Sequence, residues 1–143
     1  MPNNKKVIPF SQSKCWTFFD WVDEAGSNPI QAWLEGESFE VQMLFNSVLK
    51  MAQKQANHLE WNCYRHKMKG KEGIHELGFL AGGRQYRLLV KFDGVKKMVL
   101  LCGCYHKMQK WTPADAPTIA VNRSRALANG KAKIYERKIQ DDL

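Results

Sequence analysis

The segment LLCGCYHKMQKWTP (residues 100–113) changes from apolar to chemically active side chains within a single residue. Its first half is typical of a buried strand, and Tyr105, His106 and Lys107 follow directly, with Lys110 soon after. A histidine exchanges protons near neutral pH, and fixed positive charge stabilises a phosphate during phosphoryl transfer. The segment therefore predicts a site for phosphate chemistry where a core strand ends, although a lone histidine such as His106 often has only a structural role.

Arg87 lies near the start of a second β-rich run, YRLLVKF (residues 86–92). Alternate residues of a strand point to the same side, so Arg87 and Lys91 should share one face of a sheet. The planar guanidinium of an arginine fixed there binds phosphate through a fork of N–H donors. The alternative is an ordinary cross-strand ion pair, for which Glu76 is the available carboxylate.

The stretch YRHKMKGK (residues 64–71) is a basic loop or strand lead-in that contains Lys67, Lys69 and Lys71 beside one aromatic residue. Cations that pair with phosphates and rings that stack on bases are a usual combination in RNA-binding surfaces. The stretch is equally consistent with a solvated connector. His75, a few residues further on, could face the same site or lie at its rim.

The net charge of +8 is concentrated in the middle third of the 143-residue chain. Residues 61–110 contain eleven Lys and Arg against three acidic residues, whereas the segments before and after them are nearly neutral. Concentrated positive charge attracts polyanions and releases their counterions. Nucleic acid is therefore the leading candidate partner, and a merely solvated basic face is the alternative.

The length and composition are those of a single domain over residues 1–143, with a core over about residues 14–128 and flexible tails at both ends. No apolar run approaches the roughly 20 residues that a membrane-spanning helix needs. The first residues also lack the apolar centre of a signal peptide. These features predict a cytoplasmic protein that does not interact with membranes.

The four cysteines predict neither disulfides nor a metal site. In a cytoplasmic chain of this size, Cys15, Cys63, Cys102 and Cys104 are expected to be reduced and to act as small apolar fillers. Cys102, Cys104 and His106 would share one face of a strand, but there is no evident fourth ligand and no C-x-x-C pair. We therefore expect no metal ion and no cofactor.

Hydrophobic periodicity and turn residues divide the chain into seven expected elements. Asn28, Pro29 and Ser38 are typical of helix starts, and Asp93-Gly94 is a strong hairpin signal. The expected strands are residues 14–22, 73–80, 84–92 and 96–105, and the expected helices are residues 29–36, 38–57 and about 113–128. The last residues, from Lys131 onward, are expected to form a short helix or a frayed tail.

This order of elements predicts an α+β fold built on a small antiparallel sheet. The short turns between the three later strands require antiparallel neighbours. The two N-terminal helices each expose one apolar stripe, which must pack on a sheet face. We therefore expect both helices on one face, with a C-terminal helix to follow, and the cations of the middle third gathered on the other, uncovered face.

The motifs together resemble the RelE/ParE toxin superfamily, and within it the HigB-like, phage-associated branch. The resemblance covers roughly residues 14–128, and its segments are FFDWVDEAGSNPIQAWLE, KMKGKEGIHELGF, GGRQYRLLVKFDG and VLLCGCYHKMQKWTP. It implies a RelE-like fold and the toxin of a type II toxin–antitoxin system. Such a toxin is a ribosome-dependent messenger-RNA endonuclease that a helix-turn-helix antitoxin of the HigA-like kind silences.

The resemblance also implies a chemistry and assigns residues to it. In such metal-free ribonucleases the 2′-hydroxyl attacks the adjacent phosphate. By position, Arg87 matches the strand arginine that holds the scissile phosphate, and Tyr105, His106 and Lys107 match the group that stacks on a base or moves protons. The expected RNA-binding cations are Lys67, Lys69, Lys71, Arg84, Lys91 and Lys110.

One departure from the family pattern bears on activity. The family's glutamate-leucine-arginine run is Glu76-Leu77-Gly78 here, so an arginine expected on the sheet face is absent, and Arg84 or His75 could compensate. His106 stands where the family usually has a small residue or a lysine, which could shift proton transfer onto it. Two alternatives remain: a catalytically degenerate protein that binds RNA or the ribosome, and a ParE-like inhibitor of DNA gyrase.

Overall fold

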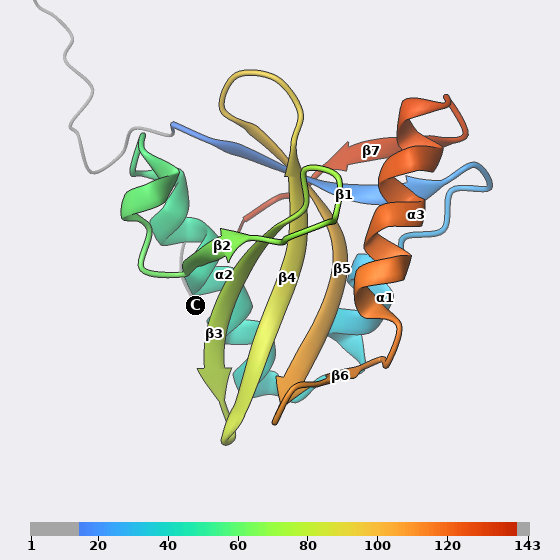
Figure 1. Ribbon diagram of the computed structural model, residues 1–143. Coiled ribbons are helices and arrows are strands. Elements are labelled where there is room, and N and C mark those ends of the chain that lie inside the picture. The colour runs from blue at the N-terminus through green and yellow to red at the C-terminus, as the bar shows by residue number, and fades with distance from the viewer. Residues whose placement is uncertain (1–14, 140–143) are drawn as a thin grey trace, which may run out of the picture.

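A computed structural model, shown in Figure 1, describes residues 15–139, so the predicted N-terminal tail and the last four residues lie outside this range. None of its helices is long and apolar enough to cross a membrane. In chain order the elements are β1 (Thr17–Asp23), α1 (Pro29–Glu35), α2 (Phe39–Gln53), a short 3-10 helix (His58–Glu60), β2 (Tyr64–Lys67), β3 (His75–Ala81), β4 (Arg84–Phe92), β5 (Lys97–Lys107), β6 (Lys110–Thr112), α3 (Ala116–Ala128) and β7 (Ala132–Glu136).

The strands of the described range form one seven-stranded sheet in the order β2-β3-β4-β5-β1-β7, with β6 paired to β5. β3, β4 and β5 form its antiparallel centre, as the tight turns between them require. β1 is parallel to β5, which the long excursion between these two strands permits. The predicted α+β class is therefore confirmed, with the β1–β5 pair as the exception to antiparallel pairing among the described strands.

The two N-terminal helices lie behind the sheet in the view of Figure 1, as predicted. The Asn28 side chain accepts the N–H of Gln31 at the start of α1, and the Ser38 hydroxyl accepts the N–H of Val41 in α2. Buried residues of α2, such as Phe45, pack with those of the central strands in one core. We call this side of the sheet the helix-covered face.

A glycine in β5 allows α1 to approach the sheet closely. A Cβ on Gly103 would lie only 2.2 Å from Cε3 of Trp33, and real atoms do not come so close. The indole of Trp33 therefore lies directly over the strand backbone at Gly103. This contact fixes how far α1 stands from β5, the strand that ends in the predicted reactive cluster.

The opposite side of the sheet is only partly uncovered, contrary to the prediction. α3 crosses it beside β5, and Ala116 and Ala120 are buried there in a second core. The loop over residues 68–74 crosses in front of β4 and buries Ile74 in the same core. An ion pair of 3.0 Å between Glu72 and Arg125 ties this loop to α3. The small side chains of Ala116 and Ala120 let α3 pack closely on the sheet. Only the part of this face that α3 and the loop do not cover is open.

The end of the described chain is a strand, and the prediction of a helix or frayed tail after Lys131 is wrong. β7 pairs antiparallel with β1, and Ala132 and Ile134 alternate inward against the second core. The strand ends at an ion pair of 3.1 Å between Arg137 and the buried Asp20 of β1. The sequence did not predict this strand because Ala132 and Ile134 form only a short apolar alternation, and charged residues surround them.

The predicted reactive segment forms a hairpin that the sequence did not indicate. β5 extends to Lys107, and β6 returns beside it as an additional short strand. Met108 and Gln109 make the turn with positive φ values of 53° and 78°. Such turns usually contain Asn or Gly, so Met-Gln gave no signal. The following helix consequently begins at Ala116 rather than near Pro113.

Candidate active site

The uncovered part of the sheet presents alternate residues of β3, β4 and β5, and we call it the open face. Gly78, Arg87 and Cys104 lie in register across these three strands. His106, two residues beyond Cys104, is paired with Gln85 and projects to the same side. Diagonal neighbours of this kind are about 7–8 Å apart, within reach of long side chains. The structure therefore places Arg87 and His106 on the same face of the sheet.

Arg87 is held by a buried carboxylate. Its Nε lies 3.2 Å from Oε1 of Glu76, whose side chain is only 6% exposed. Its Nη1 donates to the Tyr86 carbonyl at 3.0 Å and lies 3.4 Å from Oε1 of Gln85. These contacts fix the plane of the guanidinium while leaving its side chain 14% exposed. The predicted alternative, an ion pair with Glu76, is thus present, and it also orients Arg87 for binding.

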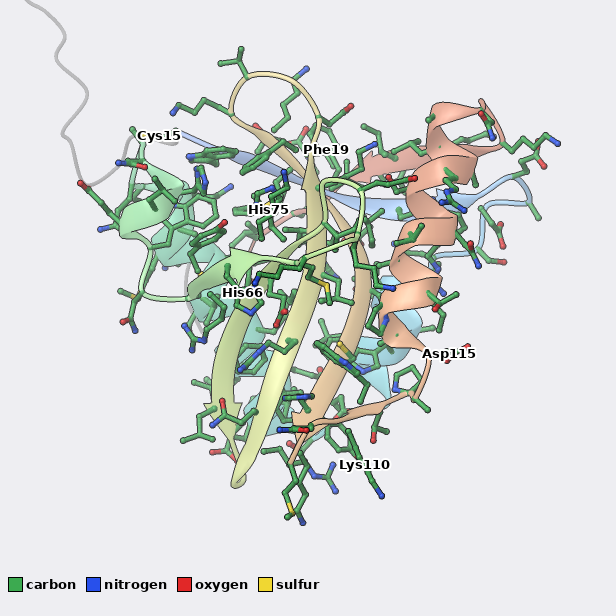
Figure 2. All side chains as sticks on the ribbon, viewed as in Figure 1. Cys15, Phe19, His66, His75, Lys110 and Asp115 are labelled. Atoms are coloured by element: carbon green, nitrogen blue, oxygen red, sulfur yellow. The ribbon has the colours of Figure 1, made fainter. Side chains whose placement is uncertain are left out.

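The same carboxylate contacts a histidine from the neighbouring strand. His66 Nε2 on β2 lies 3.2 Å from Oε2 of Glu76, so the carboxylate lies between His66 and Arg87. The His66 side chain is 62% exposed, and Figure 2 shows it in front of the sheet. A titratable ring oriented by a buried carboxylate is an arrangement that proton-transfer sites use. His66 therefore belongs to the site.

Arg65 on β2 approaches Gly78, the residue of β3 that is paired with Arg87. Its Nε lies 2.9 Å from the position that a Cβ of Gly78 would occupy, and Arg87 Nη1 lies 2.6 Å from that position. A cavity of about 370 Å³ adjoins this point beside the edge of β3, and Arg65 and Gly78 are among its lining residues. The other lining residues include the apolar Trp61 and Leu80. The site thus has positive charge next to an apolar hollow.

His106 packs against an aromatic residue of the hairpin. Its ring centroid is 4.6 Å from that of Trp111, at an interplanar angle of 44°. The two residues are paired across β5 and β6, so the hairpin limits the orientation of the imidazole. Both side chains are half-buried, which leaves the ring accessible from solvent. The unexpected strand β6 therefore contributes directly to the position of the predicted proton-transfer group.

The thiol of Cys104, in register with Arg87, is unsuited to nucleophilic chemistry. Cys104 is buried, and its hydrogen bond with Cys102, together with burial, raises its pKa well above the usual range of a thiol. A thiol held neutral in this way is a poor nucleophile. Within residues 15–139 no group of three or more His, Cys, Asp or Glu side chains is placed to hold a metal ion. The open face itself presents arginine, histidine and carboxylate side chains.

Tyr105 and Arg84 lie on the helix-covered face, away from Arg87 and His106. The Arg84 guanidinium lies 4.4 Å from the centroid of the Tyr105 ring, and Tyr105 packs against Tyr86. The strand alternation that places His106 on the open face necessarily places Tyr105 on the other. The structure therefore separates Tyr105 from His106, although the sequence predicts both in one reactive cluster.

His75, the other residue expected to compensate for Gly78, is also on the helix-covered face. Its Nδ1 is 2.9 Å from the Tyr64 hydroxyl, and its ring lies 4.6 Å from that of Phe92. Neither His75 nor Arg84 approaches Gly78, so the expectation of compensation by these two residues is wrong. The residue that does reach Gly78 is Arg65.

The predicted lysines, which include Lys107 of the expected catalytic group, do not join the centre of the open face, and strand alternation places Lys107 on the side of Tyr105. Lys107 and Lys110 are exposed and paired with each other at the tip of the β5–β6 hairpin. Figure 2 shows Lys110 far from His66, at the other end of the sheet. The remaining positions are at the opposite end: Lys67 on β2, Lys69 and Lys71 in the loop over residues 68–74, and Lys91 near the end of β4.

Arg65 and His66 are not recognisable from the sequence as individual site residues, although both lie in the basic stretch of residues 64–71. The register of β2 against β3 shifts between Tyr64 and His66, which is a β-bulge. Because of this bulge, consecutive residues both reach the open face, where regular alternation would separate them. A bulge has no dependable sequence signature, so only the basic composition of the stretch indicated these residues.

Comparison with known proteins identifies one family. A family model described as Phage derived protein Gp49-like (DUF891) matches residues 32–124. The matched range contains Arg65, Glu76, Gly78, Arg87 and His106, which are the central residues of the open face. No curated protein and no solved structure matches the chain.

Proposed function

The chain belongs to the Gp49-like family of phage-derived proteins, a toxin-like family, and from this premise we propose that it is a messenger-RNA endonuclease toxin. The observation that carries the proposal is the placement of Arg87 and His106 as diagonal neighbours on one face of the sheet. A fixed guanidinium beside an accessible imidazole supplies the two groups that phosphodiester cleavage by an internal hydroxyl requires.

In the proposed reaction, the 2′-hydroxyl oxygen of the RNA attacks the neighbouring phosphorus while the bond from phosphorus to the 5′-oxygen breaks. The products are a 2′,3′-cyclic phosphate and a free 5′-hydroxyl. His106 acts either as the general base that accepts the proton of the 2′-hydroxyl or as the general acid that protonates the leaving 5′-oxygen, and solvent water completes the other transfer. Arg87, held by Glu76, stabilises the additional negative charge on the phosphorane. No step of this reaction requires a metal ion.

The distribution of charge supports RNA as the partner. Lysines occur near both ends of the central sheet, with Lys107 and Lys110 at the hairpin tip and Lys69 in the loop over residues 68–74. A strand that crosses the open face between these ends would meet Arg87 on its way. We propose that the ribosome presents messenger RNA in this way in the cytoplasm, and that a helix-turn-helix antitoxin silences the protein.

Arg87 provides the direct test of this function. Messenger RNA should be cut when the wild-type protein is added to a cell-free translation extract, and Arg87→Ala should lower the cleavage rate by about 10²–10³-fold because one preorganised charge contact is lost. Lys133→Ala removes an exposed charge from the distant strand β7 and should cleave at the wild-type rate. Equal survival of messenger with the wild-type and Arg87→Ala proteins would contradict the assignment of Arg87.

The second candidate function is binding of RNA or the ribosome without cleavage. It is favoured by Gly78, because the arginine that the RelE-type resemblance leads one to expect at that position is absent. Mapping the 5′ ends of messenger fragments distinguishes the two functions. New ends that depend on Arg87 support the nuclease, whereas inhibited translation without new ends supports the binding protein.

A further inference from the structure

Two guanidinium groups converge on a glycine at the centre of the open face. Arg65 Nε and Arg87 Nη1 lie 2.9 Å and 2.6 Å from the same point, the position of a Cβ on residue 78. The distance between these two nitrogen atoms is therefore no greater than the sum of those values. Like charges repel at such a separation, so their convergence indicates that the site is arranged for an anion.

The two guanidinium groups have different hydrogen-bonding partners. Glu76 is the carboxylate in contact with Arg87, and it is shared with His66. Arg65 Nη1 donates to the Asn62 carbonyl at 2.8 Å, which is a neutral acceptor. Glu76 therefore offsets the charge of Arg87, whereas the hydrogen bond of Arg65 is to a neutral group. A phosphate bound by both forks would provide the missing negative charge.

Gly78 is what permits the two side chains to meet. It lies in the interior of β3. Glycine weakens a strand at such a position, and it often marks a place where another group approaches the backbone closely. Any side chain at this position would occupy the space that Arg65 and Arg87 now share. Gly78 itself is buried beneath them, whereas Arg65 is exposed and can reach a ligand.

We propose that Arg65 and Arg87 together bind one phosphate group over Gly78. The proposal deepens the function proposed above and rests on it for the identity of the ligand, which is a phosphodiester of the RNA substrate. Arg65 is then a second phosphate-binding residue, and Gly78 is a specific requirement of the site rather than a sign of a degenerate enzyme.

Titration with inorganic phosphate tests the shared site without any need for cleavage. The NMR signals of the Arg65 and Arg87 Nε–H groups should shift together with a single midpoint. Arg65→Ala and Gly78→Ala should each weaken phosphate binding at Arg87 by about tenfold, as expected for loss of one charged contact. Arg65→Lys keeps the charge without the fork and should retain part of the affinity, and Lys133→Ala should bind like the wild type.

Two results would overturn the shared site: separate midpoints for the two arginines, or unchanged phosphate affinity in Arg65→Ala. Because Arg65 is exposed, its replacement should leave the protein folded. Thermal unfolding of each variant verifies this, and Arg65→Lys gives a second reading if Arg65→Ala is unstable.

Cleavage assays separate this proposal from the proposed function. Arg65→Ala should lower kcat/KM for RNA by about 10–100-fold, less than Arg87→Ala because Arg65 is more exposed. Cleavage that depends on Arg87 but not on Arg65 would overturn the shared site and leave the nuclease assignment intact. The opposite result is also informative: Arg65 and Arg87 could titrate with phosphate at a single midpoint in a protein that cuts no RNA. That result would contradict the proposed nuclease function and support the shared anion site.

Discussion

The two faces of the central sheet are built from alternate residues of the same strands, yet they differ in almost every physical property. The helix-covered face buries Leu77, Leu88 and Leu100 under α1 and α2. The open face presents Arg87 and His106, with Glu76 as a buried carboxylate beneath them. Alternate residues of a strand face opposite sides, so core packing restricts the residue types on one side only. Reactive side chains can therefore occupy the positions on the other side.

Residues that are adjacent in the sequence can lie on different faces of the sheet. Tyr105 and His106 are adjacent in the sequence but belong to different faces, so proximity along a strand is a poor guide to proximity in a site. Conversely, Arg65 and Arg87 are distant in sequence and meet over Gly78. A site on a sheet is therefore better read from strand pairing than from clusters of residue types.

Substitution of the two adjacent residues gives the largest expected difference between the faces. His106→Ala should lower the rate of RNA cleavage by about 10²–10⁴-fold, the usual contribution of a general acid or base. Tyr105→Phe retains the ring that packs on Tyr86 and should lower the rate by less than about tenfold. Single-turnover cleavage of a defined RNA measures both effects.

The circular dichroism spectra of these two variants provide the control, because both should remain folded. A larger loss of activity in Tyr105→Phe than in His106→Ala would contradict the division of labour between the faces. It would return Tyr105 to the catalytic role that the sequence resemblance gave it.

Much of the covered face was predictable because it obeys local rules. The N-caps Asn28 and Ser38 and the amphipathic stripe of α2 are visible in the sequence, and the structure confirms both helix starts. Helix α2 nevertheless exposes the apolar Met51 and buries Leu49 completely. Periodicity fixes the existence of a helix better than the exact orientation of its stripe.

The core at Gly103 offers a way to disturb the covered face without altering the open one. Gly103→Ala would place a Cβ 2.2 Å from the Trp33 ring, and overpacking of this kind costs roughly 1–3 kcal/mol in the free energy of unfolding. Urea denaturation measures the loss. Cleavage per folded molecule should persist, since the added methyl group points away from Arg87 and His106.

Gly36→Ala is the matched control for this substitution. Its added Cβ would have its nearest neighbour at 3.5 Å, an ordinary van der Waals contact at the end of α1. Stability should stay equal or rise slightly, because alanine reduces the freedom of the unfolded chain. Equal unfolding midpoints for the Gly103→Ala and wild-type proteins would show that α1 can move away from β5 at no cost.

The open face was less predictable, because its geometry depends on features without a sequence signal. The bulge in β2 directs Arg65 and His66 to the same side, and the Met108–Gln109 turn brings Trp111 against His106. Arg87 could be assigned from strand alternation because its strand was correctly predicted, whereas His106 lies just beyond the predicted end of its strand at residue 105. Tertiary pairing determined the remaining contacts.

The histidines of the covered face give the smallest effect, a loss of stability at acid pH. Burial and the nearby Lys96 lower the pKa of His58, and burial, His58 and Lys67 lower the pKa of His75. Both rings therefore bind protons less readily in the folded protein than in the unfolded chain, where a histidine titrates near pH 6.5. The stability of the folded state is retained above that pH and falls as the pH drops below it.

Replacement of both rings should flatten this dependence. We expect the urea midpoint of the wild type to decline as the pH falls from about 8 to about 5.5, and the decline to be smaller in the double variant His58→Gln/His75→Gln. The effect should be modest because both rings are only half-buried and solvent screens their charges. Above the titration range of histidine, the two proteins should differ by a constant amount that reflects packing against Phe92. An equally steep decline in the double variant would place the acid sensitivity elsewhere, in groups that these two histidines do not contact.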